Sequence, residues 1–390
     1  MYGTTRSQET GGWTDAAELP SPRRWFGPSE GLVVLADDAH TVLAAGGATA
    51  GDAPTAEALL LDPVTGAWSA TGGLGTARHS HSVTLLADGR ILVAGGLTGG
   101  PAGGAPVRLA SAELYDPAAG TWAPTGPMTV ARSLHCATAL PDGRVLVTGG
   151  QGARDPKAPE RALAGAEWYD PADGTWTPAA PMTEPRLGHP AVVLPGGQVL
   201  VAGGERSIGR YRGIGQGFCE LYDPAADAWT PTGSLRTPRR NHQATPLADG
   251  TVLVTGGDGP DIRVEGAFVP YGQWRTERYS PATGAWTPGG NMPDGRTGHR
   301  AVPLPSGRVL VTGGTDSATW DAGYAATALY DPATRGWIRT GGLATGRFFG
   351  SVVPLPDGRV LAAGGTVRAG AANPAPGTDL LTASCEYFWP

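Results

Sequence analysis

The stretch GTWAPTGPMTVARSLHCATALPDGRVLVTGG (120–150) recurs in altered form along the whole chain. Within it, Arg132 follows Trp122 by ten residues, and the pair Gly149-Gly150 follows Arg132 by seventeen and ends a short apolar run. The ten-residue step is kept in seven copies, namely Trp13/Arg23, Trp68/Arg78, Trp122/Arg132, Trp176/Arg186, Trp229/Arg239, Trp286/Arg296 and Trp337/Arg347. A repeat of 51 to 57 residues with this signature predicts a ring of similar units, each buried against its neighbours.

Each copy predicts four strands. LHCATAL (134–140) and RVLVTGG (144–150) flank Asp142-Gly143, which favours a hairpin with a two-residue primed turn. AELYDP (112–117) and GTWAPTGPM (120–128) read as the third and fourth strands on either side of an Asp-Pro turn. One copy is therefore one antiparallel, four-stranded blade.

The two ends of the chain complement each other. CEYFWP (385–390) aligns with a third strand, and GGWTDAAELPSPR (11–23) aligns with a fourth strand and the next Arg. We therefore expect the N-terminal strand to complete the seventh blade, which pairs the last open edges. Residues 11–390 are predicted to form one all-β, seven-bladed propeller, and residues 1–10 a disordered or extended tail.

The double Gly, the Tyr-Asp-Pro and the spaced Trp resemble kelch repeats over residues 11–390, and this resemblance implies a β-propeller. It leaves function open, because kelch propellers include peptide-binding modules, sugar isomerases, iron-dependent specifier proteins and copper oxidases. The sequence lacks the Tyr-His pair of the copper oxidases and the Glu, Asp and His at four-residue steps of the specifier proteins. We therefore expect no metal and no cofactor.

Composition narrows the setting. A net charge of -6 argues against non-specific nucleic-acid binding. No basic apolar N-terminal segment or long apolar run is present, so we expect a cytoplasmic protein that makes no membrane contact. Cys136, Cys219 and Cys385 lie in different blades and are expected to be free thiols. Lys157 is the only lysine, a bias typical of GC-rich genomes such as those of actinobacteria.

One face of the ring is predicted to bind ligands. In an up-and-down blade, the connections from the second to the third strand emerge on the side opposite the tight turns. The irregular insertions all belong to these connections: 97–111, 151–165, 205–218, 258–275, 315–327 and 366–384. Variable loops on a rigid scaffold are the usual place for a ligand site.

The repeated Arg and His residues allow two interpretations each. Arginines at the mouth of the central channel, among them Arg78, Arg239, Arg296 and Arg347, suit a carboxylate or phosphate. Alternatively, the ring pairs with third-strand carboxylates, for example Glu113, Glu167, Glu220, Glu277 or Glu386. Histidines three residues after the Arg occur in five blades, one in each, a spacing that favours structural hydrogen bonds over a metal site: His81, His135, His189, His242 and His299.

Residues that break the repeat are the candidates for catalysis. Glu205 and Asp258 directly follow a Gly-Gly, and Asp316 lies one residue further on in the next blade. Converging carboxylates would provide an acid/base pair in which one group raises the pKa of the other, although solvated loop carboxylates would look the same. His79, beside Arg78, is a further candidate acid or base.

Other exceptions favour a pocket for an organic ligand, unless they only pack the loops. They are Trp25, Tyr211, Arg240, Asn241, Tyr271, Arg300, Trp320, Phe348 and Phe349. Two functions remain open. The first is a propeller that binds an anionic small molecule or a peptide at the loop-bearing mouth. The second is a cofactor-free isomerase, cyclase, lyase or hydrolase of specialised metabolism.

Overall fold

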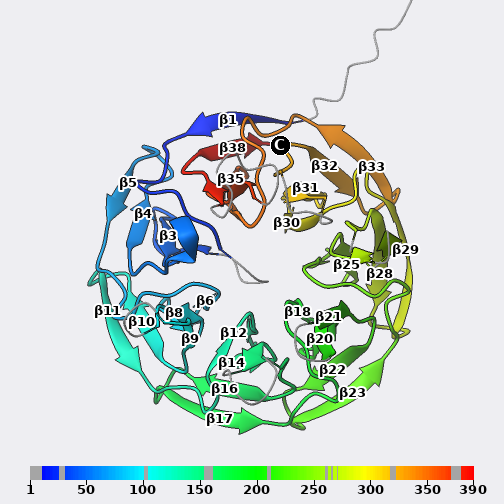
Figure 1. The fold of residues 1–390 in the computed structure, drawn as a ribbon, viewed down its shortest axis with the longest axis horizontal. Coiled ribbons are helices and arrows are strands. Elements are labelled where there is room, and N and C mark those ends of the chain that lie inside the picture. The colour runs from blue at the N-terminus through cyan, green and yellow to red at the C-terminus, as the bar shows by residue number, and fades with distance from the viewer. Residues whose placement is uncertain are drawn as a thin grey trace, which may run out of the picture.

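The computed structural model describes residues 11–25, 31–100, 104–152, 161–208, 212–259, 262–264, 267–269, 271–316, 322–369 and 379–390. Seven four-stranded antiparallel sheets stand in a ring around a central axis (Figure 1). The predicted seven-bladed propeller is therefore confirmed. The part of the chain that the structure describes holds no helix long and apolar enough to cross a membrane.

Blades are numbered in chain order. Blade 1 consists of β2 (Leu32–Val34), β3 (Val42–Ala45), β4 (Ala58–Leu61) and β5 (Trp68–Ala70). Blade 2 consists of β6 (Ser82–Leu85), β7 (Ile91–Ala94), β10 (Ala112–Asp116) and β11 (Thr121–Thr125). Blade 3 consists of β13 (Cys136–Ala139), β14 (Val145–Thr148), β16 (Ala166–Asp170) and β17 (Thr175–Ala179). Blades 4 and 5 consist of β18 (Ala191–Val193), β19 (Val199–Ala202), β22 (Cys219–Asp223) and β23 (Ala228–Thr232), and of β24 (Gln243–Pro246), β25 (Val252–Thr255), β28 (Arg275–Ser280) and β29 (Ala285–Asn291). Blade 6 is β30 (Thr297–Pro303), β31 (Val309–Thr315), β32 (Thr327–Asp331) and β33 (Gly336–Thr340); blade 7 is β34 (Ser351–Pro354), β35 (Val360–Ala363), β38 (Cys385–Trp389) and β1 (Gly12–Ala16).

Short paired strands and one 3-10 turn lie in the connections between the second and third strands, except for the short strand Arg132–Ser133, which directly precedes the first strand of blade 3. They are β8 (Leu97–Thr98) with β9 (Val107–Arg108), β12 (Arg132–Ser133) with β15 (Gln151–Gly152), β20 (Glu205–Ile208) with β21 (Arg212–Gly215), β26 (Ile262–Val264) with β27 (Ala267–Val269), β36 (Thr366–Arg368) with β37 (Leu380–Leu381), and the turn Ala50–Asp52. We call this side the loop face and the opposite side the turn face.

The two ends of the chain meet as predicted. Strand β1 pairs antiparallel with β38, from Gly12 opposite Trp389 to Ala16 opposite Cys385 (Figure 1). The rings of Trp13 and Phe388 lie 5.3 Å apart, and Trp13 Nε1 donates to Thr327 Oγ1 of blade 6 at 3.1 Å. The clasp therefore closes blade 7 and ties it to its neighbour.

The tight turns differ from the prediction. Leu140 N donates to the Arg144 carbonyl at 2.8 Å, which leaves three residues in the loop, and Gly143 N donates to the Leu140 carbonyl. Only Gly143 has a positive φ, 91°, whereas a primed two-residue turn needs two such residues. The Asp-Gly pair therefore forms a three-residue loop that ends in a left-handed glycine.

The repeated Trp residues join neighbouring blades. Trp176 Nε1 donates to the Gly126 carbonyl of blade 2 at 2.7 Å, and Trp229 Nε1 donates to the Ala180 carbonyl of blade 3 at the same distance. Each indole also packs on the Tyr of its own third strand, with centroids 5.0 Å apart for Tyr169 and Trp176. In these two blades the preceding blade supplies the acceptor that an indole N–H needs, whereas Trp122 Nε1 and Trp337 Nε1 have no partner within the described chain.

The Gly-Gly pairs are contact points between blades. Gly149 and Gly150 have φ of 59° and 92°, and a Cβ on Gly149 would collide with the Arg186 carbonyl and the His189 ring. Gly150 N donates to that carbonyl at 2.8 Å, and the same bond joins all seven neighbouring blades. Only glycine combines this conformation with so close an approach.

The repeated arginines are buried and bind groups inside their own blades, as the second of the two interpretations predicts. The Arg132 guanidinium donates to the Gly149 and Gly165 carbonyls at 2.8 and 2.9 Å and to Glu167 Oε1 at 2.6 Å. The five predicted glutamate partners all form this buried pair: Arg78–Glu113, Arg132–Glu167, Arg186–Glu220, Arg239–Glu277 and Arg347–Glu386. In blade 1, Arg23 pairs with Glu57 instead, and in blade 6, Arg296 lies 3.4 Å from Asp294.

The repeat histidines are buried between blades. His189 Nε2 lies 2.9 Å from Thr148 Oγ1, and His299 Nε2 lies 2.9 Å from Thr255 Oγ1, in each case a residue of the preceding blade. Burial, aided by the neighbouring Arg78 and Arg132, lowers the pKa of His81 and His135 to about 3. The three cysteines are free and buried, as expected.

Deleting residues 1–18 should lower the melting temperature strongly or cause aggregation, because it removes β1 and leaves the edge of β38 unpaired. Deleting residues 1–8, which leaves β1 intact, is the control. Differential scanning fluorimetry and light scattering measure both effects. Equal melting temperatures for the two deletions would show that the clasp contributes nothing.

Glu167→Gln should lower the free energy of unfolding by about 3–5 kcal/mol, because it leaves the Arg132 guanidinium buried without its counter-charge. Asp142→Asn, which breaks the exposed pair with Arg144, should cost less than about 1 kcal/mol. Urea unfolding measures both. Similar losses in the two variants would contradict a structural role for the ring.

Acid should destabilise the fold through the buried histidines. The pKa of His135 is lowered in the folded state, so only the unfolded state gains a proton as the pH falls from about 6.5 towards 3, and stability is lost in that window. His135→Gln should reduce the loss by about 1.4 kcal/mol per pH unit. The exposed His40→Gln is the control, and an unchanged slope in His135→Gln would refute the assignment.

Candidate functional site

The loop-face mouth is narrowed by a ring of backbone, which we call the mouth ring. It consists of the residues two positions after each repeat Arg: Trp25, Ser80, Leu134, Gly188, Asn241, Gly298 and Phe349. Six of them have a φ between 51° and 61°. Backbone N–H groups bond across the seams, with Leu134 to Ser80, Gly188 to Leu134, Asn241 to Gly188, Phe349 to Gly298 and Trp25 to Phe349. Among the described residues, no such bond joins Asn241 with Gly298 or Trp25 with Ser80.

Around this ring, the residue after each repeat Arg pairs with the residue after the Gly-Gly. The pairs are Arg24 with Ala48, His79 with Leu97, Ser133 with Gln151, Leu187 with Glu205, Arg240 with Asp258, Thr297 with Thr315 and Phe348 with Thr366. Because these positions pair with each other around the mouth, residues that break the repeat at them lie close together there. It also places the carboxylates of blades 4 and 5 next to each other.

Glu205, Arg240, Asn241 and Asp258 form one cluster at the seam between blades 4 and 5. Arg240 Nη1 donates to Glu205 Oε2 at 2.7 Å, and its Nε donates to Asp258 Oδ2 at 3.2 Å. Asn241 Nδ2 donates to the same Asp258 oxygen at 3.0 Å. The predicted carboxylate pair is thus brought together, but a guanidinium lies between its members.

Asp258 is 1% exposed, and burial raises the pKa of its carboxyl, although Arg240 and Asn241 oppose the shift. Asp316 is exposed and shares no hydrogen bond or ion pair with Glu205 or Asp258 in the described part of the chain. Two of the three predicted carboxylates therefore meet. Neither member of this pair is an open proton-transfer group, because one is buried and the other is held by Arg240.

His79 lies in a second charged cluster, at the seam between blades 7 and 1 and the start of blade 2. It is buried, and its Nδ1 lies 2.9 Å from Ser80 Oγ. Burial lowers its pKa, while nearby Asp52 raises it and Arg24 lowers it further. Arg24 itself pairs with Asp52 and Asp379 beside a hollow of about 140 Å³.

The predicted ligand-binding residues divide into three groups. Arg78, Arg239, Arg296 and Arg347 are buried, and their guanidinium groups bind carboxylates and backbone carbonyls inside the blades, so they are turned away from a ligand at the mouth. Trp25, Arg300 and Phe348 are buried too, and Arg300 Nε donates to the Gly350 carbonyl at 2.8 Å. Tyr271 is half-buried, whereas Tyr211 and Trp320 lie outside the described residues.

Inside the mouth, the space is small. Phe349, whose ring lies 5.5 Å from that of Phe348, lines a cavity of about 10 Å³ together with Asn241, Gly298 and Arg300. A volume of this size holds about one water molecule. The described residues around Phe349 therefore enclose no space for an organic ligand at this point of the mouth.

Three exposed arginines of blades 4 and 5 were not predicted as site residues. They are Arg206, Arg236 and Arg275, and in the described chain none of them forms an ion pair. Arg239 Nη1 donates to the Arg275 carbonyl at 3.0 Å, and Arg236 N donates to Glu277 Oε2 at 2.7 Å, which places both beside blade 5's repeat Arg. No sequence signal distinguishes an exposed Arg of this kind from a paired one.

No group of three or more His, Cys, Asp and Glu side chains is arranged to hold a metal ion in the parts of the chain described.

Comparison with known proteins points to one family. Residues 78–129 and 132–183 each match the Kelch motif. Kelch-like protein 34 of Homo sapiens is 30% identical over 57% of this chain and 30% of its own length, and Kelch-like protein terF of Aspergillus terreus is 26% identical over 79% and 66%. The chain spans 30 to 40% of the length of the first curated relatives it matches.

A fungal alcohol oxidase in complex with copper has a similar fold, with a TM-score of 0.72 and 19% identity over 98% of this chain and 77% of its own. At that identity, the similarity concerns the fold alone. The two matched Kelch motifs and the kelch-like relatives, together with the seven blades, support the interpretation of this chain as a kelch-repeat β-propeller.

Proposed function

We propose that this protein is a binding module that takes an anionic peptide segment on its loop face, at the seam between blades 4 and 5. The observation that carries the proposal is that three exposed arginines of blades 4 and 5, Arg206, Arg236 and Arg275, have no ion-pair partner within the described chain. Guanidinium groups bind carboxylate and phosphate through paired hydrogen bonds. The preference for anions thus rests on these residues instead of the buried arginine ring.

Aromatic side chains adjoin the exposed arginines. Trp274 is 41% exposed, its ring lies 6.1 Å from that of Tyr271, and the Arg275 guanidinium lies 5.8 Å from the same indole. Trp, Tyr and Arg are the residue types that contribute most to binding at protein interfaces. An acidic segment with an aromatic or planar group therefore suits this surface.

The small size of the cavity beside Phe349 favours a peptide bound on the surface over an enclosed substrate. The cavity inside the mouth has a volume of about 10 Å³, far below the ~300–1,000 Å³ of small-molecule sites. The enzyme alternative relies on Glu205, Asp258, Asp316 and His79, of which Asp258 and His79 are buried and Glu205 is bound by Arg240. The geometry supports binding better than acid–base catalysis.

Peptides selected from a random phage-displayed library on the wild-type protein should be enriched in Asp, Glu and aromatic residues. Arg275→Ala and Trp274→Ala should each weaken the best peptide roughly tenfold in fluorescence anisotropy, because each removes an exposed contact of about 1–2 kcal/mol. Their melting temperatures should stay unchanged, since exposed side chains contribute little to stability.

The matched control is Asp142→Ala on the turn face, which should bind as the wild type does. Peptides that bind both loop-face variants with wild-type affinity, or that lose affinity with Asp142→Ala, would place the site elsewhere.

A further inference from the structure

The turn face carries the acidic excess of the chain. Every blade has at least one aspartate in its turns, from Asp37 in blade 1 to Asp357 in blade 7, and the turns hold thirteen aspartates and five arginines. Neither Glu nor Lys occurs in these turns. The turn face therefore attracts basic partners, in contrast to the exposed arginines of the loop face.

Arginines of the chain itself fill seams on the turn face. Arg90 of blade 2 donates through Nη2 to the Pro171 carbonyl of blade 3 at 2.9 Å, and Arg359 of blade 7 donates to the Pro63 carbonyl of blade 1 at 2.8 Å. Arg278 of blade 5 donates to the Pro332 carbonyl of blade 6 at 3.1 Å. In three seams, then, a guanidinium binds the carbonyl of the turn between the neighbour's third and fourth strands.

The seam between blades 3 and 4 lacks this contact. Arg144 occupies the position of Arg90, but its Nε and Nη2 donate to Asp142 Oδ2 at 2.9 and 2.6 Å, and in the described chain it makes no bond to Pro224. Its guanidinium lies 3.8 Å from the centre of the Trp168 ring, a residue that is Leu in the neighbouring blades. The arginine contact of those three seams is therefore missing here.

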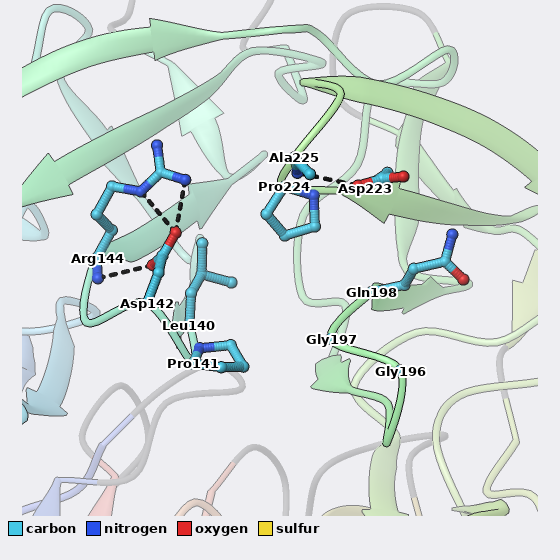
Figure 2. A pocket seen from close by; sticks show the side chains of 10 residues that line it. All are labelled: Leu140, Pro141, Asp142, Arg144, Gly196, Gly197, Gln198, Asp223, Pro224 and Ala225. Carbon is cyan, nitrogen blue, oxygen red and sulfur yellow. Dashed lines mark hydrogen bonds and ion pairs between the residues drawn. The ribbon is translucent and has the colours of Figure 1, made fainter.

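A hollow of about 460 Å³ opens at this seam. Figure 2 shows Leu140, Pro141 and Asp142 on one side and Asp223, Pro224 and Gln198 on the other. The inner turn of blade 4 reads Gly196-Gly197-Gln198, where blades 2, 3 and 7 have Asp-Gly-Arg, so it adds no cation to the hollow. The site thus combines apolar walls with the Asp223 carboxylate, the Pro224 carbonyl and the Arg144 guanidinium, which is paired with Asp142.

We propose that this hollow receives an arginine side chain of a basic protein partner. The methylene groups of the arginine would pack against Leu140, Pro141 and Pro224, and its guanidinium would donate to the Pro224 carbonyl and to Asp223. The internal arginines at Pro171, Pro63 and Pro332 make the equivalent carbonyl contact. A planar guanidinium suits this position better than an ammonium group, because it offers several donors in one plane.

The test uses a fluorescein-labelled peptide with two arginines in a Gly-Ser background, and the same peptide with citrulline, which is neutral and of similar shape. The wild-type protein should bind the arginine peptide at least roughly tenfold more tightly than the citrulline peptide, since a charge-assisted hydrogen bond contributes about 1.5–3 kcal/mol. Asp223→Asn should lower the affinity for the arginine peptide by a similar factor. Asn retains an acceptor for Ala225 N, so the turn is kept.

The matched control is Asp116→Asn, which removes the same charge from the corresponding turn of blade 2 and should change the affinity by less than about twofold. Arg275→Ala on the loop face should not change the affinity for the arginine peptide. The test of this hollow is therefore independent of the test of the loop-face site. Equal binding of the citrulline peptide, equal losses in Asp116→Asn and Asp223→Asn, or no binding at all would overturn the proposal.

Discussion

The contact between each Gly-Gly pair and the next blade's repeat Arg holds the ring together. The second Gly donates to the carbonyl of that Arg in all seven seams, while the side chain of each Arg binds the first Gly of its own blade and, in five blades, a third-strand glutamate. Each repeat Arg therefore forms hydrogen bonds both within its own blade and to the preceding blade. A buried arginine is tolerable only because carbonyl and carboxylate acceptors surround it.

This constraint separates the scaffold from the positions that vary. The repeat Arg, the repeat His and both glycines are committed to packing, so their neighbours in sequence are the first residues free to differ. Arg240, Asn241 and Asp258 occupy such neighbouring positions, and together with Glu205 they make the charged cluster of blades 4 and 5. The turn face varies less, because its loops are short and repeat the Asp-Gly and Asp-Pro turns.

The fold could be predicted because spacing alone determines it. The ten-residue and seventeen-residue steps define a blade, and the partial repeats at the ends predict the pairing of β1 with β38. Less of the candidate site could be predicted from the sequence. Glu205 and Asp258 were identified as exceptions, but the guanidinium between them and the burial of Asp258 depend on a register across two blades. Arg236 and Arg275 carry no signal in the sequence, because exposure and the lack of a partner are properties of the folded chain.

The two missing bonds of the mouth ring divide the propeller into two arcs. Backbone bonds run without interruption from Ser80 through Leu134 and Gly188 to Asn241, and again from Gly298 through Phe349 to Trp25. These bonds thus join four blades into one arc and three blades into the other, and a charged cluster lies close to each junction between the arcs. At these two junctions the neighbouring blades are joined instead by the bonds from Gly257 N to the Arg296 carbonyl and from Gly47 N to the Arg78 carbonyl, both 2.9 Å long, so the seams depend on the Gly-Gly contacts and not on the mouth ring.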